Sequence, residues 1–220
     1  MDQNLTPERH NRFFKICYPL LKGFAWLVMT VLGPFRSIGS YRVPRSGGVL
    51  ILSNHRADVD PIAVQLATPR PIHFMAKSEL FTIPILGAFL RFFKAFPVNR
   101  GAPDRQSIKH AVRLLQMGET VCIFPEGQLS ETGHLRPVLP GAALIVRMAN
   151  VPVICCGITN TDRIMPYGKV WPRPSFKTVT VTWGEAHSFE PKTENDEILA
   201  WVDAELRSLT EDYERPIEFD

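Results

Sequence analysis

The sequence predicts an α/β fold in which helices flank a mostly parallel central sheet. Short apolar runs such as Val49–Leu52 and Val121–Ile123 alternate along the chain with longer amphipathic stretches, and this alternation is typical of a parallel sheet packed between helices. The 220 residues, 45% of them hydrophobic, are enough for one domain with a substantial core and too few for two ordinary domains.

The elements are expected in an alternating order. Helix 104–117 has Asp104 as its N-terminal cap and Gly118 after its end, and strand 177–183 is rich in Thr and Val. The other strands are expected at 49–53, 72–76, 120–124 and 152–158, and the other helices at 61–67, 84–94, 140–149 and 194–210.

The first 40 residues are expected to form a membrane-associating helical segment ahead of an α/β domain at 41–220. Ile16–Phe35 is strongly apolar and is flanked by basic residues. A helix that spans a bilayer needs about 20 apolar residues, and Lys22, Pro19 and Gly23 interrupt this stretch. We therefore expect a bent helical pair that lies in one leaflet.

A secretory signal peptide is the alternative for this segment, but no clear small-x-small cleavage site follows it. The stretch 83–94, with Arg91 and Lys94 beside its apolar residues, fits an interfacial helix and fits a core helix equally well.

A histidine and a carboxylate follow the first apolar run, with four residues between them. His55 comes just after the expected strand, and Asp60 precedes Pro61 at the start of the next helix. Neutral histidine can accept a proton near pH 7, and a carboxylate on its other nitrogen fixes the tautomer. The alternatives are a surface histidine and a carboxylate, Asp60 or Asp58, that only caps the helix.

Three further segments follow in order along the chain. They are Phe96-Pro97-Val98-Asn99-Arg100-Gly101, Phe124-Pro125-Glu126-Gly127-Gln128-Leu129-Ser130 and Val151-Pro152-Val153-Ile154. Together with the His55–Asp60 segment, they resemble the four sequence blocks of the glycerolipid acyltransferase family. The resemblance covers about residues 40–185 and is closest to the 1-acylglycerol-3-phosphate, or lysophosphatidic acid, acyltransferases.

The resemblance implies a role for each matching residue. His55 would be the general base and Asp60 the residue that orients it. Arg100 would bind the phosphate of the acceptor, and Glu126 and Gly127 would lie at the acceptor site.

One departure from the family pattern concerns the acceptor. The third block commonly continues Glu-Gly-Thr-Arg-Ser, but here Gln128 and Leu129 follow the Glu-Gly pair. The usual arginine is therefore absent, and Arg136 or His134 shortly downstream could replace its charge.

The chemistry of a phosphate-bearing acceptor also requires cations, and arginine suits bidentate contacts with phosphate. Arg100 and Lys77, which closes the apolar run 73–76, are the candidates. The alternative for both is solvated surface charge, the commoner position of a basic residue. There is no Gly-x-Ser-x-Gly motif, so direct attack by a hydroxyl activated by His55 is expected.

The resemblance implies transfer of a fatty acyl chain from acyl-CoA or acyl carrier protein to lysophosphatidic acid in phospholipid biosynthesis. The expected partners are this lipid acceptor, the acyl donor and the cytoplasmic face of the cell membrane, and no cofactor or metal is implied. The net charge of +3 is too small to suggest nucleic acid. Four cysteines without metal-ligand spacing indicate free thiols in a reducing compartment.

Three alternatives remain open at this stage. The enzyme could acylate another lysophospholipid such as lysophosphatidylethanolamine, or the chain could be a non-catalytic lipid-binding protein on the same fold. A metal-dependent phosphoesterase would use His55, Asp58, Asp60 and Glu126, although only six histidines are present in the chain.

Overall fold

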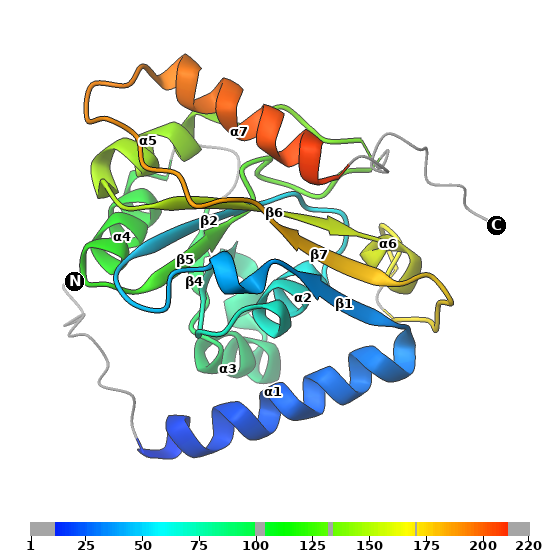
Figure 1. The fold of residues 1–220 in the computed structure, drawn as a ribbon. Helices are drawn as coiled ribbons and strands as arrows, with labels where there is room; N and C mark the ends of the chain where they lie inside the picture. The colour runs from blue at the N-terminus through cyan, green and yellow to red at the C-terminus, as the bar shows by residue number, and fades with distance from the viewer. Residues whose placement is uncertain (1–11, 100–103, 132–133, 170, 211–220) are drawn as a thin grey trace.

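A central sheet of seven strands organises the described part of the chain (Figure 1). The computed structural model describes residues 12–99, 104–131, 134–169 and 171–210. The strand order is β1-β7-β6-β2-β5-β3-β4, and every neighbouring pair is parallel except β6–β7. This confirms the predicted α/β class. The strands are β1 (Phe35–Ile38), β2 (Val49–Ser53), β3 (His73–Lys77), β4 (Phe96–Val98), β5 (Thr120–Ile123), β6 (Val153–Thr159) and β7 (Val179–Trp183).

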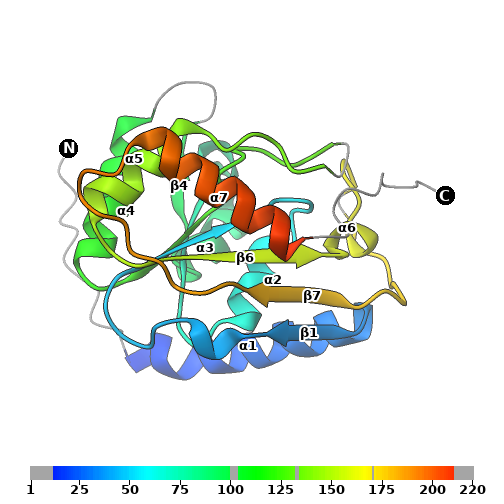
Figure 2. The same cartoon turned by 45° about the horizontal axis from the view of Figure 1, so that its top comes forward.

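Helices cover both faces of this sheet. One face carries α4, α5 and α7, and the opposite face carries α1, α2 and α3 (Figures 1 and 2). The helices are α1 (Arg12–Leu32), α2 (Asp60–Ala67), α3 (Pro84–Phe92), α4 (Arg105–Gln116), α5 (Pro140–Ala149), α6 (Thr161–Ile164) and α7 (Asn195–Leu209), with short 3-10 turns at Ser40–Arg42 and Ser78–Thr82.

Strand β2 lies at the centre of the core. Leu50 and Leu52 pack into the apolar cluster under α4, α5 and α7, whereas Val49 and Ile51 pack into the cluster on the opposite face. All four side chains are fully buried. A strand buried on both faces has an unbroken apolar sequence, which is why this segment is recognisable without tertiary information.

The N-terminal segment differs from its prediction, because Arg12–Leu32 is one helix with Pro19 inside it and not a bent pair. Apolar residues with good helix propensity on both sides of Pro19 continue the helix, and tertiary contacts hold it. Tyr18 packs on Phe93 just after α3, and Met29 is buried in the core.

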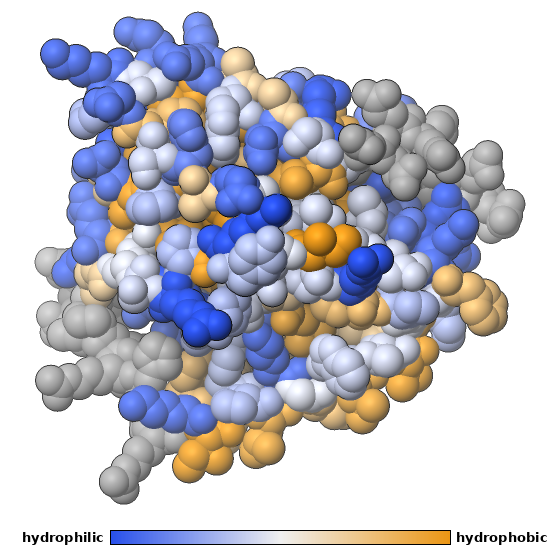
Figure 3. Space-filling model, viewed as in Figure 1, coloured by the Kyte–Doolittle hydropathy of each residue, from blue (hydrophilic) through white to orange (hydrophobic). Residues whose placement is uncertain are grey.

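Most of the apolar surface of α1 nevertheless faces outward. Leu20 and Phe24 are 69% and 64% exposed, and apolar side chains line the lower edge of the molecule, where α1 lies (Figures 1 and 3). By length and composition alone, Phe14–Leu32 is sufficient to cross a membrane.

Sequence patterns did not indicate the edge strands β1 and β4 or the single-turn helix α6. β1 pairs with β7 in parallel, so the boundary predicted at residue 40 falls after the first strand of the sheet. A strand of three or four residues is too short to show a period of two, and only pairing with its neighbour defines it.

Candidate active site

The carboxyl ends of the central strands bring the predicted histidine and acid together. β2 lies between β5 and β6 and runs parallel to both. His55 follows β2, Glu126 follows β5 and Asp162 follows β6, so all three belong to the same edge of the sheet. This is the edge at which open parallel sheets bind ligands.

His55 and Asp60 form a buried hydrogen-bonded pair. His55 Nδ1 lies 2.9 Å from Asp60 Oδ2, and the same oxygen accepts the backbone N–H groups of Arg56 at 2.6 Å and Ala57 at 2.8 Å. Asp60 is the first residue of α2 and makes no cap bond to it, since the N-cap is Val59. The simple helix-cap alternative therefore does not describe this carboxylate.

The geometry determines which nitrogen of His55 can act as a base. A carboxylate at Nδ1 favours the tautomer in which Nδ1–H donates, and the lone pair then belongs to Nε2. The imidazole also stacks on Phe124, with ring centroids 4.0 Å apart and planes at 15°. The ring is thus held both at its edge and on one face, in a site with little access to water.

Glu126 holds the backbone of the site together. Its Oε1 accepts the backbone N–H of His55 at 2.7 Å, and its Oε2 accepts that of Arg136 at 2.8 Å. Burial, at 3% exposure, raises the pKa of this carboxyl to about 7 against the lowering effect of the two N–H bonds, and Asp60 adds to the rise. Since both oxygens are engaged, Glu126 positions the His55 segment.

Gly127 forms the turn that follows β5. Its φ of 73° lies in the left-handed region, and a Cβ here would come 2.5 Å from Leu139 Cδ1. The Gly127 N–H donates to Phe124 O at 3.0 Å. Glycine is therefore required by the backbone, and this N–H already has an acceptor.

The predicted phosphate-binding cations are only partly brought to the site. Arg100 lies outside the described residues. Lys77 ends β3, is half exposed and pairs with the exposed Glu79 at 3.3 Å. Arg136, which the sequence suggested as a replacement for the missing arginine, has its backbone N–H on the same Glu126 carboxylate that accepts the backbone N–H of His55.

Residues without a predicted role hold the His55 segment on β6. The side chain of Asn54 donates to Ile158 O at 2.9 Å and accepts from Ile158 N at 2.7 Å. Arg56 Nε lies 3.1 Å from Asp162 Oδ1, and both side chains are almost fully buried. Asp162 follows a predicted strand, and that position was the only signal in the sequence that could have identified it.

Two of the three carboxylates that a metal-dependent phosphoesterase would use have other partners. Asp60 and Glu126 bind backbone N–H groups and His55 as described above, and Asp58 is exposed. Within the described ranges, no group of three or more His, Cys, Asp and Glu side chains could hold a metal ion.

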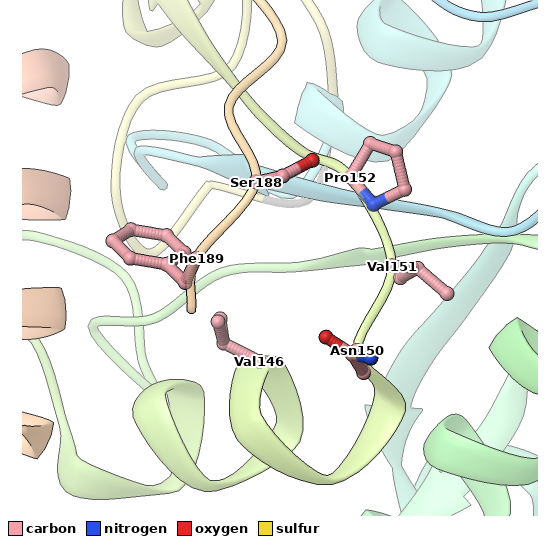
Figure 4. A pocket seen from close by; sticks show the side chains of 6 residues that line it. All are labelled: Val146, Asn150, Val151, Pro152, Ser188 and Phe189. Atoms are coloured by element: carbon pink, nitrogen blue, oxygen red, sulfur yellow. The ribbon is translucent and has the colours of Figure 1, made fainter. Parts of the chain in front are cut away.

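A small cavity lies at the opposite edge of the sheet. It has a volume of ≈ 100 Å³ and is lined by Val146, Asn150, Val151, Pro152, Ser188 and Phe189 (Figure 4). Pro152 precedes β6, whereas the His55 site follows the carboxyl ends of the strands. The cavity is therefore separate from the candidate active site, and its volume suits a few water molecules only.

An α/β sheet with a buried His–Asp pair at its carboxyl edge makes this site a candidate for an enzyme that uses histidine as a base. Comparison with known proteins shows which family the chain belongs to. The Acyltransferase family model matches residues 35–159. A 1-acyl-sn-glycerol-3-phosphate acyltransferase of Bacillus subtilis is 34% identical over 142 residues, which are 64% of this chain and 68% of that protein. A protein of the same name from Streptococcus pneumoniae is 31% identical over 64% of this chain and 53% of its own length.

A solved structure shares the fold. The 1-acyl-sn-glycerophosphate (LPA) acyltransferase of Thermotoga maritima superposes with a TM-score of 0.78 at 21% identity, over 96% of this chain and 85% of that one. Because the family model matches more than half of its residues, the chain belongs to the acyltransferase family.

Proposed function

We propose that this protein transfers a fatty acyl chain from a thioester donor to the free hydroxyl of lysophosphatidic acid, giving phosphatidic acid. The observation that carries the proposal is the buried His55–Asp60 pair in a chain whose relatives bear the name of this activity. The donor is acyl-CoA or acyl carrier protein, and the reaction needs no metal or prosthetic group.

The proposed mechanism follows from the orientation of His55. Nε2 removes the proton of the acceptor hydroxyl as the oxygen attacks the thioester carbonyl, and a tetrahedral oxyanion forms. Asp60 stabilises the imidazolium through Nδ1–H. The intermediate then collapses with cleavage of the carbon–sulfur bond, and the imidazolium returns its proton to the thiolate leaving group. The products are the ester and the free thiol.

The acceptor phosphate requires a cation near this site. We assign the contact to Arg136 together with Arg100. The hydrogen bonds from the backbone N–H groups of Arg136 and His55 to the same carboxylate, Glu126, support the choice of Arg136. Lys77 is a weaker candidate because its ammonium group is paired with Glu79. Since Gln128 and Leu129 replace the usual Thr-Arg pair, an acceptor such as lysophosphatidylethanolamine is the second candidate.

A lipid acceptor also places the protein at a membrane. The exposed apolar side chains of α1 support this location, and we propose that the enzyme works on the cytoplasmic face of the cell membrane. In that arrangement α1 is the principal anchor.

The test is acyl transfer by the purified protein in detergent, with labelled acyl-CoA or acyl carrier protein and a panel of lysophospholipids. We expect product from lysophosphatidic acid, complete loss in His55→Ala, and normal activity in His187→Ala. His187 is an exposed histidine at the amino end of β6, where its backbone forms hydrogen bonds with the backbone of Val153. It is therefore a matched control.

Each other outcome has a definite meaning. Product from a different acceptor alone would keep the chemistry and change the substrate. Absence of product from every donor and acceptor would contradict the enzyme and favour a lipid-binding protein.

A further inference from the structure

An exposed loop between α6 and β7 combines aromatic and basic side chains. We propose that this loop is a second membrane contact of the protein, which binds anionic lipid headgroups beside α1. We call it the aromatic–cationic loop and define it by Lys169, Trp171, Arg173, Phe176 and Lys177.

The aromatic side chains of this loop make no contribution to the core. Trp171 is 84% exposed and Phe176 is fully exposed. Large apolar side chains that are exposed to water bury no surface on folding. Their transfer out of water, into a membrane or a partner, lowers the free energy. Aromatic rings are also the side chains that concentrate at the membrane–water interface.

The charged side chains that the loop itself carries are all basic. They are Lys169, Arg173 and Lys177, and the sequence contains no Asp or Glu from residue 163 to residue 184. The acidic groups nearby come from outside this stretch: Glu131 accepts a hydrogen bond from Tyr167 at 3.0 Å, and Asp162 pairs with Arg163 at 3.8 Å. Basic side chains near a surface of anionic lipid each add about fivefold to binding. The aromatic rings would insert at the boundary of the acyl chains, and the cations would contact the anionic headgroups. The loop therefore suits both parts of a membrane interface.

Hydrogen bonds and two prolines restrict the backbone of the loop over residues 171–177. Arg173 N donates to Ile164 O at 2.8 Å, and Lys177 N donates to Ser175 Oγ at 3.1 Å. Pro172 and Pro174 limit the backbone further. An exposed segment that is already ordered loses little conformational entropy when it binds.

The loop is attached to the last turn of α1. Ser175 N donates to Leu32 O at 2.6 Å, and a Cβ on Gly33 would come 2.7 Å from Ser175 O. Both ribbon views place the loop beside the C-terminal end of α1 (Figures 1 and 2). Val31, in that turn, is 72% exposed, so the loop extends the exposed apolar surface of the helix.

A membrane accounts for these features better than a nucleic acid does. Nucleic acid would use the cations and stack on the rings, but it would leave the adjoining apolar side chains of α1 in water. A bilayer with anionic headgroups covers α1, the rings and the cations together.

The test is partitioning of the full chain onto vesicles of phosphatidylcholine alone and of phosphatidylcholine with phosphatidylglycerol, measured by flotation over a lipid titration at low salt. We expect Lys169→Gln with Lys177→Gln to lower the partition coefficient on the anionic vesicles by about 25-fold, at about fivefold for each cation, and to leave that on neutral vesicles unchanged. Phe176→Ser should lower both. The charge-matched control is Lys109→Gln with Lys192→Gln, two exposed lysines outside the loop.

A direct readout uses Trp171 itself. Lipids brominated on the acyl chain should quench part of the tryptophan emission of the wild-type protein, and this quenched part should be smaller in Trp171→Phe. The part that remains is expected from Trp26 of α1, which is 53% exposed. Equal partitioning of the loop variant and the control variant, or unchanged quenching in Trp171→Phe, would overturn the proposal.

Acyl transfer in detergent separates this inference from the proposed function. The loop variants should retain full turnover in mixed micelles, where no vesicle has to be bound. A chain that binds anionic vesicles through the loop but never turns over would contradict the proposed activity and leave the lipid contact intact.

Discussion

In the proposed mechanism Asp60 orients His55, because one of its oxygens accepts His55 Nδ1–H and two backbone N–H groups. Asp60→Asn should keep the fold, since an amide oxygen can still accept the backbone bonds. It should lower kcat by about 10²–10⁴-fold, because an amide stabilises the imidazolium less than a carboxylate does. Steady-state acyl transfer in detergent measures this effect.

A control separates this loss from unfolding. The thermal unfolding temperature of Asp60→Asn should stay close to that of the wild type, although its kcat is much lower. Wild-type turnover in Asp60→Asn would show that the carboxylate has no part in the reaction.

Glu126 should make stability depend on pH. Its pKa rises from 4.5 unfolded to about 7 in the folded protein, so the folded state holds this proton more tightly. The contribution to stability is complete below pH 4.5 and is lost as the pH rises to about 7, a loss on the order of 3 kcal/mol. Urea unfolding between pH 4.5 and pH 7 measures this loss. The free energy of unfolding of the wild type should fall over this range relative to that of Glu126→Gln, in which position 126 cannot titrate.

The comparison also tests the positioning role of Glu126. An amide has one acceptor oxygen in place of two, so either the His55 N–H or the Arg136 N–H loses its partner, and kcat should fall in Glu126→Gln. If the wild type and Glu126→Gln had parallel pH dependences of stability, Glu126 would have an ordinary pKa.

The loop between β2 and α2 is held against β6 and α6. Arg56 and Asp162 supply a buried ion pair across this junction. Removal of one partner of such a pair costs about 3–5 kcal/mol, because the other charge stays buried. Asp162→Leu should therefore lower the free energy of unfolding by about that amount.

The double variant Arg56→Leu with Asp162→Leu should recover part of this loss, since it leaves no unpaired charge. A double-mutant cycle from urea unfolding curves gives the coupling free energy. Additive effects of the two substitutions would mean that the pair contributes nothing beyond its separate side chains.

The apolar surface of α1 extends over the part of the molecule that we propose to contact the membrane. Leu20, Phe24 and Leu27 are 69%, 64% and 55% exposed. Their joint replacement by Ser should leave the core intact, because Met29 remains as the buried contact of α1. It should lower partitioning onto neutral vesicles by about two to three orders of magnitude.

The same flotation assay measures this change, and near-UV circular dichroism reports whether the core is unchanged. A matched variant on the other side of the sheet replaces Leu144 and Met148 of α5, which are each 41% exposed. Equal loss of binding in the two variants would contradict a specific role for α1.

Much of the architecture follows from local patterns in the sequence. Strand β2 and helix α5 have the predicted bounds, because a doubly buried strand is apolar throughout and a helix shows a period of 3.6 residues. Asp104 caps α4 as predicted and accepts from Gln106 N and Ser107 N. The spacing of His55 and Asp60 was also sufficient to predict that the two side chains lie together, since a short turn between a strand and a helix allows few arrangements of them.

Contacts between distant parts of the chain decided the rest. Glu126 was expected to lie at the acceptor site, and the hydrogen bonds of its carboxylate to the backbone of His55, 71 positions before it, and of Arg136, 10 positions after it, could not be read from local patterns. Asp162 became a partner of Arg56 only because β6 lies beside β2. The pairing of the edge strands and the continuation of α1 as one helix through Pro19 likewise depend on contacts with neighbouring elements. Periodicity and motifs are properties of adjacent residues, whereas the partner of a buried polar group depends on which strands lie side by side.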